Sequence, residues 1–306
     1  MIPRLYYLLK PYIPRPIQIA IRRQVFRWKL PKTTGFWPID EIACNPPPGW
    51  KGWPDGKRFA LVLTHDVDTL RGHDRCKDLA AVEMERGVRS SFNFVPERYP
   101  VSRELRNLLT SSGFEVGVHG LNHDGKYFQS RELFRARAER INRFLREWQA
   151  VGYRSPSMLR RLDWFHDLEI LYDASTFDTD PFEAQPEGMA TIFPFRVEDS
   201  VNRKGYVELP YTLPQDFTVF ILMGARDTVL WEKKLAWIAE RGGMALMNTH
   251  PDYMHFGGAR RSTEEYPSRF YSDFLRHIET EYGGSYWHVL PKDLASWFDS
   301  VDHEGS

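Results

Sequence analysis

Three groups of acidic and histidine residues each follow a short apolar run of this sequence. In parallel α/β folds, polar residues at the carboxyl ends of strands gather at one edge of the sheet and form the active face. Carboxylates and imidazoles gathered there could bind a divalent metal ion and transfer protons. The residues that we expect to meet are Asp66, Asp68, His119, His123 and His250.

The spacing within these groups favours a metal site. His119 and His123 are four residues apart, so one helical turn would place both imidazoles on the same side. Asp66 and Asp68 are two apart on an extended chain and therefore point the same way. Alone, such a histidine pair is more often a surface or core feature. With two carboxylates beside it, one carboxylate can bind a metal ion while the other stays free as a base.

The elements that must position these residues alternate along the chain. Short apolar and β-branched runs bounded by turn residues predict strands, and stretches with apolar residues at helical spacing predict helices between them. Repeated strand–helix units predict a parallel sheet, open or closed into a barrel. The predicted strands are 58–64, 90–95, 114–118, 169–174, 206–210, 244–249 and 286–290, and the predicted helices are 103–112, 131–149, 229–241 and 267–281.

Composition excludes several classes of protein. Lys plus Arg equals Asp plus Glu at 41 each, so no net positive field favours nucleic acid. Cys44 and Cys76 could form one bridge at most, which fits a reducing compartment. No apolar run approaches the ~20 residues of a membrane span, and prolines and arginines interrupt any signal-peptide pattern near the N-terminus. We therefore expect a cytoplasmic protein.

The N-terminal segment is basic, with no acidic residue before Asp40. A helix is predicted from Pro16, with an apolar face formed by Ile17, Ile21, Val25 and Trp28. Two interpretations remain open. The helix either packs across one end of the barrel, which we favour slightly, or brings residues 1–32 onto the anionic inner surface of a membrane.

Two regions are predicted along the chain. Residues 1–56 form a basic amphipathic N-terminal extension, which ends in a Pro- and Gly-rich wrapping loop over 44–56. Residues 57–306 form the barrel with the catalytic residues.

The ordered set of groups resembles the polysaccharide deacetylase family, also called the NodB-homology or carbohydrate esterase 4-like family. The segment Thr64–Asp68 is similar to the family's first motif in its Asp-Val-Asp form, in which the second acid is shifted by one. His119 and His123 match its His-x-x-x-His motif, and His250 matches its last motif. Arg154-Ser155-Pro156-Ser157 matches the Arg-x-Pro-Tyr motif in part. The resemblance covers roughly residues 57–298 and implies a distorted parallel (β/α)7-type barrel with an N-terminal extension.

The resemblance implies a role for each matched residue. Asp66 would be the general base, His250 the general acid, and Asp68, His119 and His123 the metal ligands. Arg154 would orient Asp66, and the backbone N–H of Ser157 would contact the oxyanion. Asp178 is the candidate that tunes His250, with Asp173 and Asp180 as alternatives. The segment Glu208–Asp216 is expected to be a loop on the active face, with Tyr211 as a candidate substrate contact.

The function that the resemblance implies is metal-dependent hydrolysis of an N-acyl group, such as N-acetyl, from an amino sugar in a glycan or a lipid-linked glycan precursor. A divalent ion polarises an amide carbonyl and makes water acidic enough to attack near neutral pH. Zinc is the default ion for an Asp-His-His set, and cobalt, nickel or manganese would also fit. The alternatives are a deformylase, a metal-free amide hydrolase as in the allantoinase-like branch of the superfamily, or an inactive glycan-binding relative.

Overall fold

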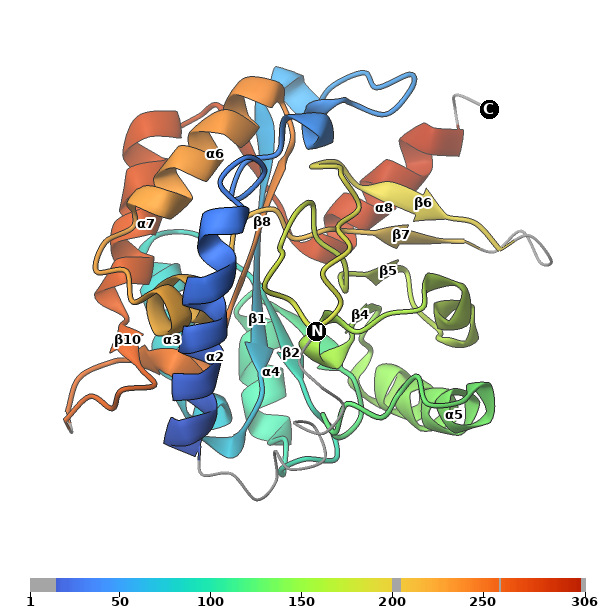
Figure 1. Cartoon of the computed structure of the whole chain (residues 1–306). Coiled ribbons are helices and arrows are strands. Elements are labelled where there is room, and N and C mark those ends of the chain that lie inside the picture. The colour runs from blue at the N-terminus through green and yellow to red at the C-terminus, as the bar shows by residue number, and fades with distance from the viewer. Residues whose placement is uncertain (1–14, 200–204, 259, 304–306) are drawn as a thin grey trace.

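The computed structural model describes residues 15–199, 205–258 and 260–303. A curled, mostly parallel sheet forms its centre, in the order β11-β1-β2-β3-β4-β5-β7-β6, with β8 also paired to β1 (Figure 1). All seven predicted strands are present, and the prediction of a parallel α/β barrel is confirmed. The strands of this sheet are β1 Phe59–Val67, β2 Ser91–Phe94, β3 Glu115–His119, β4 Gly152–Arg154, β5 Tyr172–Asp173, β6 Phe195–Val197, β7 Tyr206–Glu208, β8 Met244–Thr249 and β11 Tyr286–His288, and a separate pair is formed by β9 Met254–His255 and β10 Tyr266–Pro267.

Helices cover the outside of the sheet, with α3, α6 and α7 on one side of β1 and β8, and α5 and α8 on the other (Figure 1). The α-helices are α2 Arg15–Lys29, α3 Leu70–Glu85, α4 Arg103–Ser111, α5 Arg131–Trp148, α6 Val229–Arg241, α7 Arg269–Tyr282 and α8 Pro291–His303. Shorter turns of helix are η2 Leu30–Lys32, η3 Glu41–Cys44, η4 Pro54–Gly56, η5 Pro156–Met158, η6 Leu162–Asp167, the π-helical η7 Phe217–Met223 and η8 Pro251–Tyr253.

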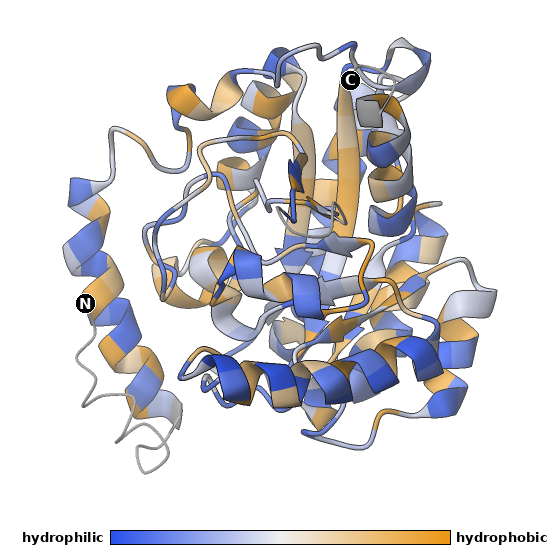
Figure 2. Ribbon diagram, turned by 90° about the vertical axis from the view of Figure 1, so that its right-hand side faces the viewer, coloured by the Kyte–Doolittle hydropathy of each residue, from blue (hydrophilic) through white to orange (hydrophobic). Residues whose placement is uncertain are grey.

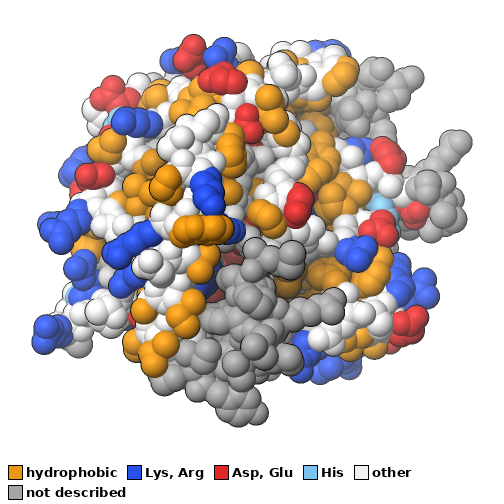
Figure 3. Space-filling model, viewed as in Figure 1, with side chains coloured by type: hydrophobic (Ala, Val, Ile, Leu, Met, Phe, Trp, Pro, Cys, Tyr) orange, Lys and Arg blue, Asp and Glu red, His pale blue; other side chains and the backbone are white. Residues whose placement is uncertain are grey.

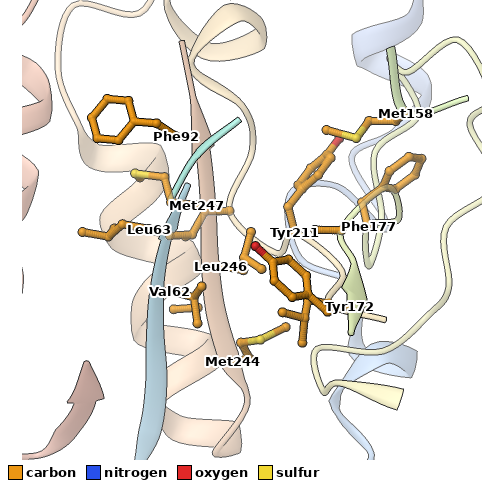
Figure 4. Packing of buried hydrophobic residues seen from close by; sticks show 14 of the residues in the cluster. Val62, Leu63, Phe92, Met158, Tyr172, Phe177, Tyr211, Met244, Leu246 and Met247 are labelled. Carbon is orange, nitrogen blue, oxygen red and sulfur yellow. The ribbon is translucent and has the colours of Figure 1, made fainter. Parts of the chain in front are cut away.

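The core lies on both faces of the curled sheet, in the barrel interior and beneath the surrounding helices. Every residue of β1 is buried, because the strand is covered on both faces. Side chains of β1 and β8 meet Tyr172 and Tyr211 across the barrel interior (Figure 4). A parallel bridge between Leu213 and Met247 brings the segment after β7 against β8 and so closes the sheet toward a barrel.

Strand register brings the predicted residues to one edge. Asp66 on β1 is paired with Asn93 on β2, and His65 is paired with Thr249 on β8. His119 on β3 is paired with Arg154 on β4. Because these strands run parallel, their carboxyl ends lie at the same edge, where a site can be built.

Residues 44–56 contact the barrel through two tryptophans. Trp50 and Trp53 pack edge to face with ring centroids 4.7 Å apart, and Trp50 also contacts Phe193 at 5.3 Å. The Trp53 indole N–H donates a hydrogen bond of 2.8 Å to the Gly242 carbonyl, which lies just before β8.

The helix predicted from Pro16 forms and packs against η7, but through a different face from the one expected. Ile19 and Phe26 face the protein and are each 3% exposed, whereas Ile17 and Trp28 are 51% and 63% exposed. In the view of Figure 2 the helix stands at the side of the barrel. Within the described residues, no helix is both long and apolar enough to span a membrane.

Candidate active site

The carboxyl-end edge of the sheet brings together the residues that the sequence singled out. Asp68 Oδ1 lies 3.4 Å from His119 Nε2 and 3.2 Å from His123 Nε2. Asp66 Oδ2 lies 3.9 Å from the same nitrogen of His119. His250 follows β8, and its electrostatic interactions reach both Asp66 and Asp68. The predicted grouping is therefore present in the structure.

The two histidines meet through a loop, so the expected helical turn between them is wrong. His119 ends β3, and the chain then turns sharply at Gly120, where φ is +64°, and at His123, where φ is +54°. A side chain at position 120 would clash with Pro156, because an added Cβ would lie 2.5 Å from its ring. The sharp turn brings the two imidazole centroids to 5.3 Å.

The loop that carries His123 is held at its far side. Asp124 accepts two hydrogen bonds of 2.7 Å from the Arg137 guanidinium of α5. The Tyr127 hydroxyl accepts hydrogen bonds from the backbone N–H groups of Leu121 and Asn122. A bidentate ion pair of this kind fixes geometry as well as charge. His123 is therefore positioned although its loop has no regular structure.

The Asp68, His119 and His123 side chains fit a divalent metal ion. Their ligand atoms all lie within 4.8 Å of one another. Asp68 Oδ1 is buried and makes no well-oriented hydrogen bond to any described residue. His119 Nδ1 lies 3.1 Å from the Arg154 carbonyl, so Nδ1 carries the proton and Nε2 offers its lone pair toward Asp68. An unpartnered carboxylate oxygen beside two imidazole nitrogens is the arrangement that an ion would complete.

Asp66 has a different environment, because three side-chain donors hold its carboxylate. Asn93 Nδ2 and Arg154 Nη1 donate to Oδ1 at 3.1 and 3.2 Å. Asn248 Nδ2 donates to Oδ2 at 2.9 Å. Burial alone would raise the pKa of Asp66, but the charge that His119 carries when it is protonated, together with the charges of Arg154 and His250, lowers that pKa to about 2. Asp66 is therefore ionised at neutral pH.

Arg154 is fully buried at the end of β4 and connects several strands. Its Nε donates to the Ala174 carbonyl at 2.7 Å, and its Nη1 also donates to Thr64 at 2.8 Å and to Asn248 Oδ1 at 2.7 Å. The guanidinium thus orients Asp66 both directly and through Asn248. Ser157 follows in η5, with an exposed side chain and a left-handed φ of +57°.

The carboxylate beside His250 is Asp216, which corrects the expectation for Asp178. Asp216 Oδ1 lies 2.7 Å from His250 Nδ1, and Asp216 Oδ2 accepts a 2.8 Å hydrogen bond from the His250 backbone N–H. Tyr266 donates to the same Oδ2 at 3.0 Å. Burial lowers the pKa of His250, but the charge and hydrogen bond of Asp216 outweigh it and raise that pKa to about 10.

Asp178 instead forms a buried ion pair with Lys234 of α6. The two alternatives also have other partners. Asp173 accepts a 2.6 Å hydrogen bond from Ser175, and Asp180 accepts one of 2.9 Å from the Tyr211 hydroxyl. Asp173, Asp178 and Asp180 are thus each held by a partner other than His250.

Tyr211 does not face an open site in this structure. It is 1% exposed, and its hydroxyl contacts Asp180 and, at 3.1 Å, Glu183. The expected role of Tyr211 as a substrate contact therefore finds no support in its position. The expectation that the segment Glu208–Asp216 belongs to the active face is supported at its last residue, because Asp216 contacts His250.

Sequence reasoning missed Asn93, Asn248 and Asp216. A signal was available for the two asparagines, because each is a polar residue near the end of an otherwise apolar strand. No such signal marked Asp216, which lies 34 residues before His250 at the start of η7. Its role depends on where η7 crosses the barrel edge.

Searches against known proteins identify the fold. No protein-family model and no curated protein matches the sequence. Among solved structures, one assigned as a polysaccharide deacetylase of Mycobacterium smegmatis has a TM-score of 0.63 at 18% identity, over 84% of this chain and 96% of that chain. One with the same assignment from Pseudomonas aeruginosa PAO1 has a TM-score of 0.57 at 16% identity, over 82% and 94%. The PuuE allantoinase has a TM-score of 0.54 at 15% identity, over 82% and 93%.

The chain therefore has the polysaccharide deacetylase fold, the distorted parallel barrel that the motif resemblance implied. The same fold is found in an allantoinase, so it does not decide which bond is hydrolysed. What distinguishes one reaction from another is the arrangement of the side chains of Asp66, Asp68, His119, His123 and His250.

Proposed function

We propose that this protein is a metal-dependent hydrolase that removes an N-acyl group, in the first place N-acetyl, from an amino sugar. The observation that carries the proposal is the convergence of Asp68, His119 and His123 beside the Asp66 carboxylate and the Asp216–His250 pair. A metal-binding set, a base and an acid are the three parts that hydrolysis of an unactivated amide needs.

Asp68, His119 and His123 would hold the ion, which would polarise the amide carbonyl and lower the pKa of water. Zinc is the default for this set, and cobalt, nickel and manganese also accept it. The proton on the Nδ1 of His119 is fixed by the Arg154 carbonyl, and this leaves Nε2 as the ligand atom.

Asp66 would take a proton as the water oxygen forms its bond to the carbonyl carbon. Three hydrogen bonds fix the orientation of the Asp66 carboxylate. Because its low pKa makes Asp66 a weak base, its contribution depends mainly on this fixed position beside the water. The backbone N–H of Ser157 is the candidate donor to the developing oxyanion.

His250 would give a proton to the departing nitrogen when the C–N bond breaks, so that the products are a carboxylic acid and an amine. Asp216 holds His250 through Nδ1, which leaves Nε2 as the atom that donates. An amine leaves poorly unless it is protonated, and the high pKa of His250 keeps that proton in place at neutral pH.

Release of acetate from a panel of N-acetylated amino sugars tests this proposal. The purified chain is assayed after chelation and again after zinc, cobalt, nickel or manganese is restored, with the Asp66→Asn variant as the inactive control. The panel also contains an N-formyl sugar and allantoin, which represent the alternative reactions. Activity that survives chelation unchanged, or turnover of allantoin alone, contradicts the proposal.

We also place the protein in the cytoplasm, because Cys44 and Cys76 are both free and a reducing compartment fits such a pair. Fractionation of cells that express the full chain tests this placement.

A further inference from the structure

The outward face of α2 carries large apolar side chains that are exposed. Ile17, Ile21 and Trp28, here called the outer stripe, are 51%, 38% and 63% exposed. At 100° per residue they lie on one side of the helix, opposite the buried Ile19 and Phe26. Figure 3 shows apolar and basic side chains together on this face of the molecule. Contiguous apolar groups on a surface mark a site of contact.

The outer stripe is not needed to hold α2 on the barrel, because the other face does so. Arg23 Nε donates a 2.7 Å hydrogen bond to the Ile221 carbonyl of η7, and Lys29 donates one of 2.9 Å to the Pro181 carbonyl. The Phe26 side chain is buried where the helix packs on the barrel, against Phe182. These contacts hold the opposite face of the helix against the protein, so the outer stripe faces away from it.

All the charged residues of the helix that carries the outer stripe are positive. The helix Arg15–Lys29 contains basic residues and no acidic one. Arg27 is exposed beside the stripe, and Lys32 Nζ lies 3.4 Å from the Trp28 ring centroid. The preceding residues 1–14 contain Arg4 and Lys10 and again no acid. An apolar stripe that contains Trp and is flanked by positive charge is complementary to an anionic lipid surface.

We propose that the outer stripe of α2 docks on an anionic phospholipid bilayer. A second copy of the chain is a poorer partner, because a symmetric pair would place two basic helices face to face. The helix packs on η7, which begins directly after Asp216, the partner of His250. Docking would thus hold the His250 side of the site near lipid. This placement suits a lipid-linked amino sugar, a consequence that rests on the proposed function, whereas the docking itself does not.

Sedimentation of the full chain with vesicles tests the docking. Phosphatidylcholine vesicles that contain phosphatidylglycerol are compared with vesicles of phosphatidylcholine alone. We expect binding to the anionic vesicles, and weaker binding as salt is added, because salt screens the basic residues. The same protein samples are assayed on a soluble N-acetylated sugar, so that failure of docking and failure of the proposed reaction are separate results.

The variant Ile17→Ser/Ile21→Ser/Trp28→Ser should lose vesicle affinity by at least about tenfold, since burial of each such side chain is worth a factor of this order. Ile42→Ser is the matched control, because Ile42 is 65% exposed and lies in η3 outside the stripe. It should bind as the unaltered chain does. Arg27→Gln should weaken binding by roughly fivefold, whereas Arg103→Gln on the distant α4 should not.

Three results would overturn the proposal. The first is no binding to anionic vesicles. The second is equal binding by a stripe variant whose melting temperature and oligomeric mass are unchanged, which would place lipid contact elsewhere, for example in residues 1–14. The third is a stripe variant with a lower melting temperature or a lower oligomeric mass and no change in lipid binding. That result would mean that another segment of the chain or a second copy covers the stripe.

Discussion

Asp66 and Asp68 are two residues apart, yet the structure gives their carboxylates opposite environments. The Asp66 region is built from strands, and its carboxylate is 1% exposed and receives three hydrogen bonds. The Asp68 region is built from loops, and its carboxylate is 15% exposed with Oδ1 unpartnered among the described residues. The comparison shows how one short motif can supply both a fixed base and an open ligand.

The cause of the difference is where β1 ends. Asp66 lies within the strand, so register with β2 places Asn93 directly beside it. Asp68 lies just beyond the strand end, where no ladder partner remains. Its backbone N–H is held instead by Asp252 Oδ2 at 2.9 Å. The backbone of Asp68 is thereby fixed, while its side chain is left for the two histidines.

The largest effect should come from Asp66→Asn. Loss of a general base lowers kcat by roughly 10²- to 10⁴-fold, and the amide keeps the shape of the side chain. Because Asp66 is outside the ligand set, metal content measured by atomic emission should stay at that of the unaltered protein. A variant that also loses its metal would show that Asp66 is a ligand and would remove the distinction between the two carboxylates.

His123→Ala should abolish metal binding. A metal ion whose free concentration is 100 times its Kd stabilises a folded protein by about 2.7 kcal/mol. Added metal should therefore raise the melting temperature of the unaltered chain and leave that of the variant unchanged. Without metal the two should melt alike, because His123 lies on a loop and is 17% exposed. His277→Ala on α7 is the matched control. Metal-dependent stabilisation of the His123 variant would refute the ligand set.

Asp216→Asn should move the pH dependence of kcat/KM. His250 must be protonated to act as an acid, so activity falls as pH rises through its pKa, which Asp216 raises to about 10. Loss of that charge lowers the pKa, and the alkaline limb should shift to lower pH by about 1–3 units. Asp178→Asn is the comparison, because Asp178 pairs with Lys234. An unchanged alkaline limb in the Asp216 variant would contradict the assignment of His250 as the acid.

The same pair also links stability to pH. The pKa of His250 is higher in the folded protein than the ordinary value of 6.5, so the pair contributes stability that is present below pH 6.5 and is lost as pH rises toward about 10. Asp216→Asn should flatten this dependence in thermal melts across that window.

The comparison between the two carboxylates also shows what the sequence could predict. Asp66, Asp68, His119, His123 and His250 could be grouped because each follows an apolar run and parallel strands end at one edge. Asp216 could not be chosen over Asp178, because the partner of His250 depends on how η7 crosses that edge. Lys234 lies on the predicted helix 229–241, and a lysine is ordinarily exposed, but here it is buried against Asp178.

For the N-terminal helix too, the sequence predicted the element but not its partners. Apolar spacing correctly predicted that a helix forms from Pro16, but α2 has apolar residues on two opposite sides. Which side packs against the protein is determined by contacts with η7 and Pro181, which lie about 150–200 residues further along the chain. Periodicity within a segment contains no information about such distant partners.

The smallest effect should come from the donors around Asp66. Asn93→Ala removes one hydrogen bond to a charged group, worth about 1.5–3 kcal/mol, and should lower kcat by roughly 10- to 150-fold without loss of metal. Gly117→Ala should act in the same way, because a Cβ at position 117 would lie 2.1 Å from Asn93 Oδ1 and displace that side chain.

A double-mutant cycle then separates a shared cause from two independent ones. If Gly117→Ala acts only by displacing Asn93, the double variant should lose no more activity than Asn93→Ala alone, so the coupling is close to the whole effect of one substitution. Additive losses would mean that Gly117 serves the site in some other way, for instance through the Gly152 carbonyl that an added Cβ would approach at 3.5 Å. Non-additive losses would show that Gly117 serves Asp66 by leaving room for the Asn93 side chain that donates to it.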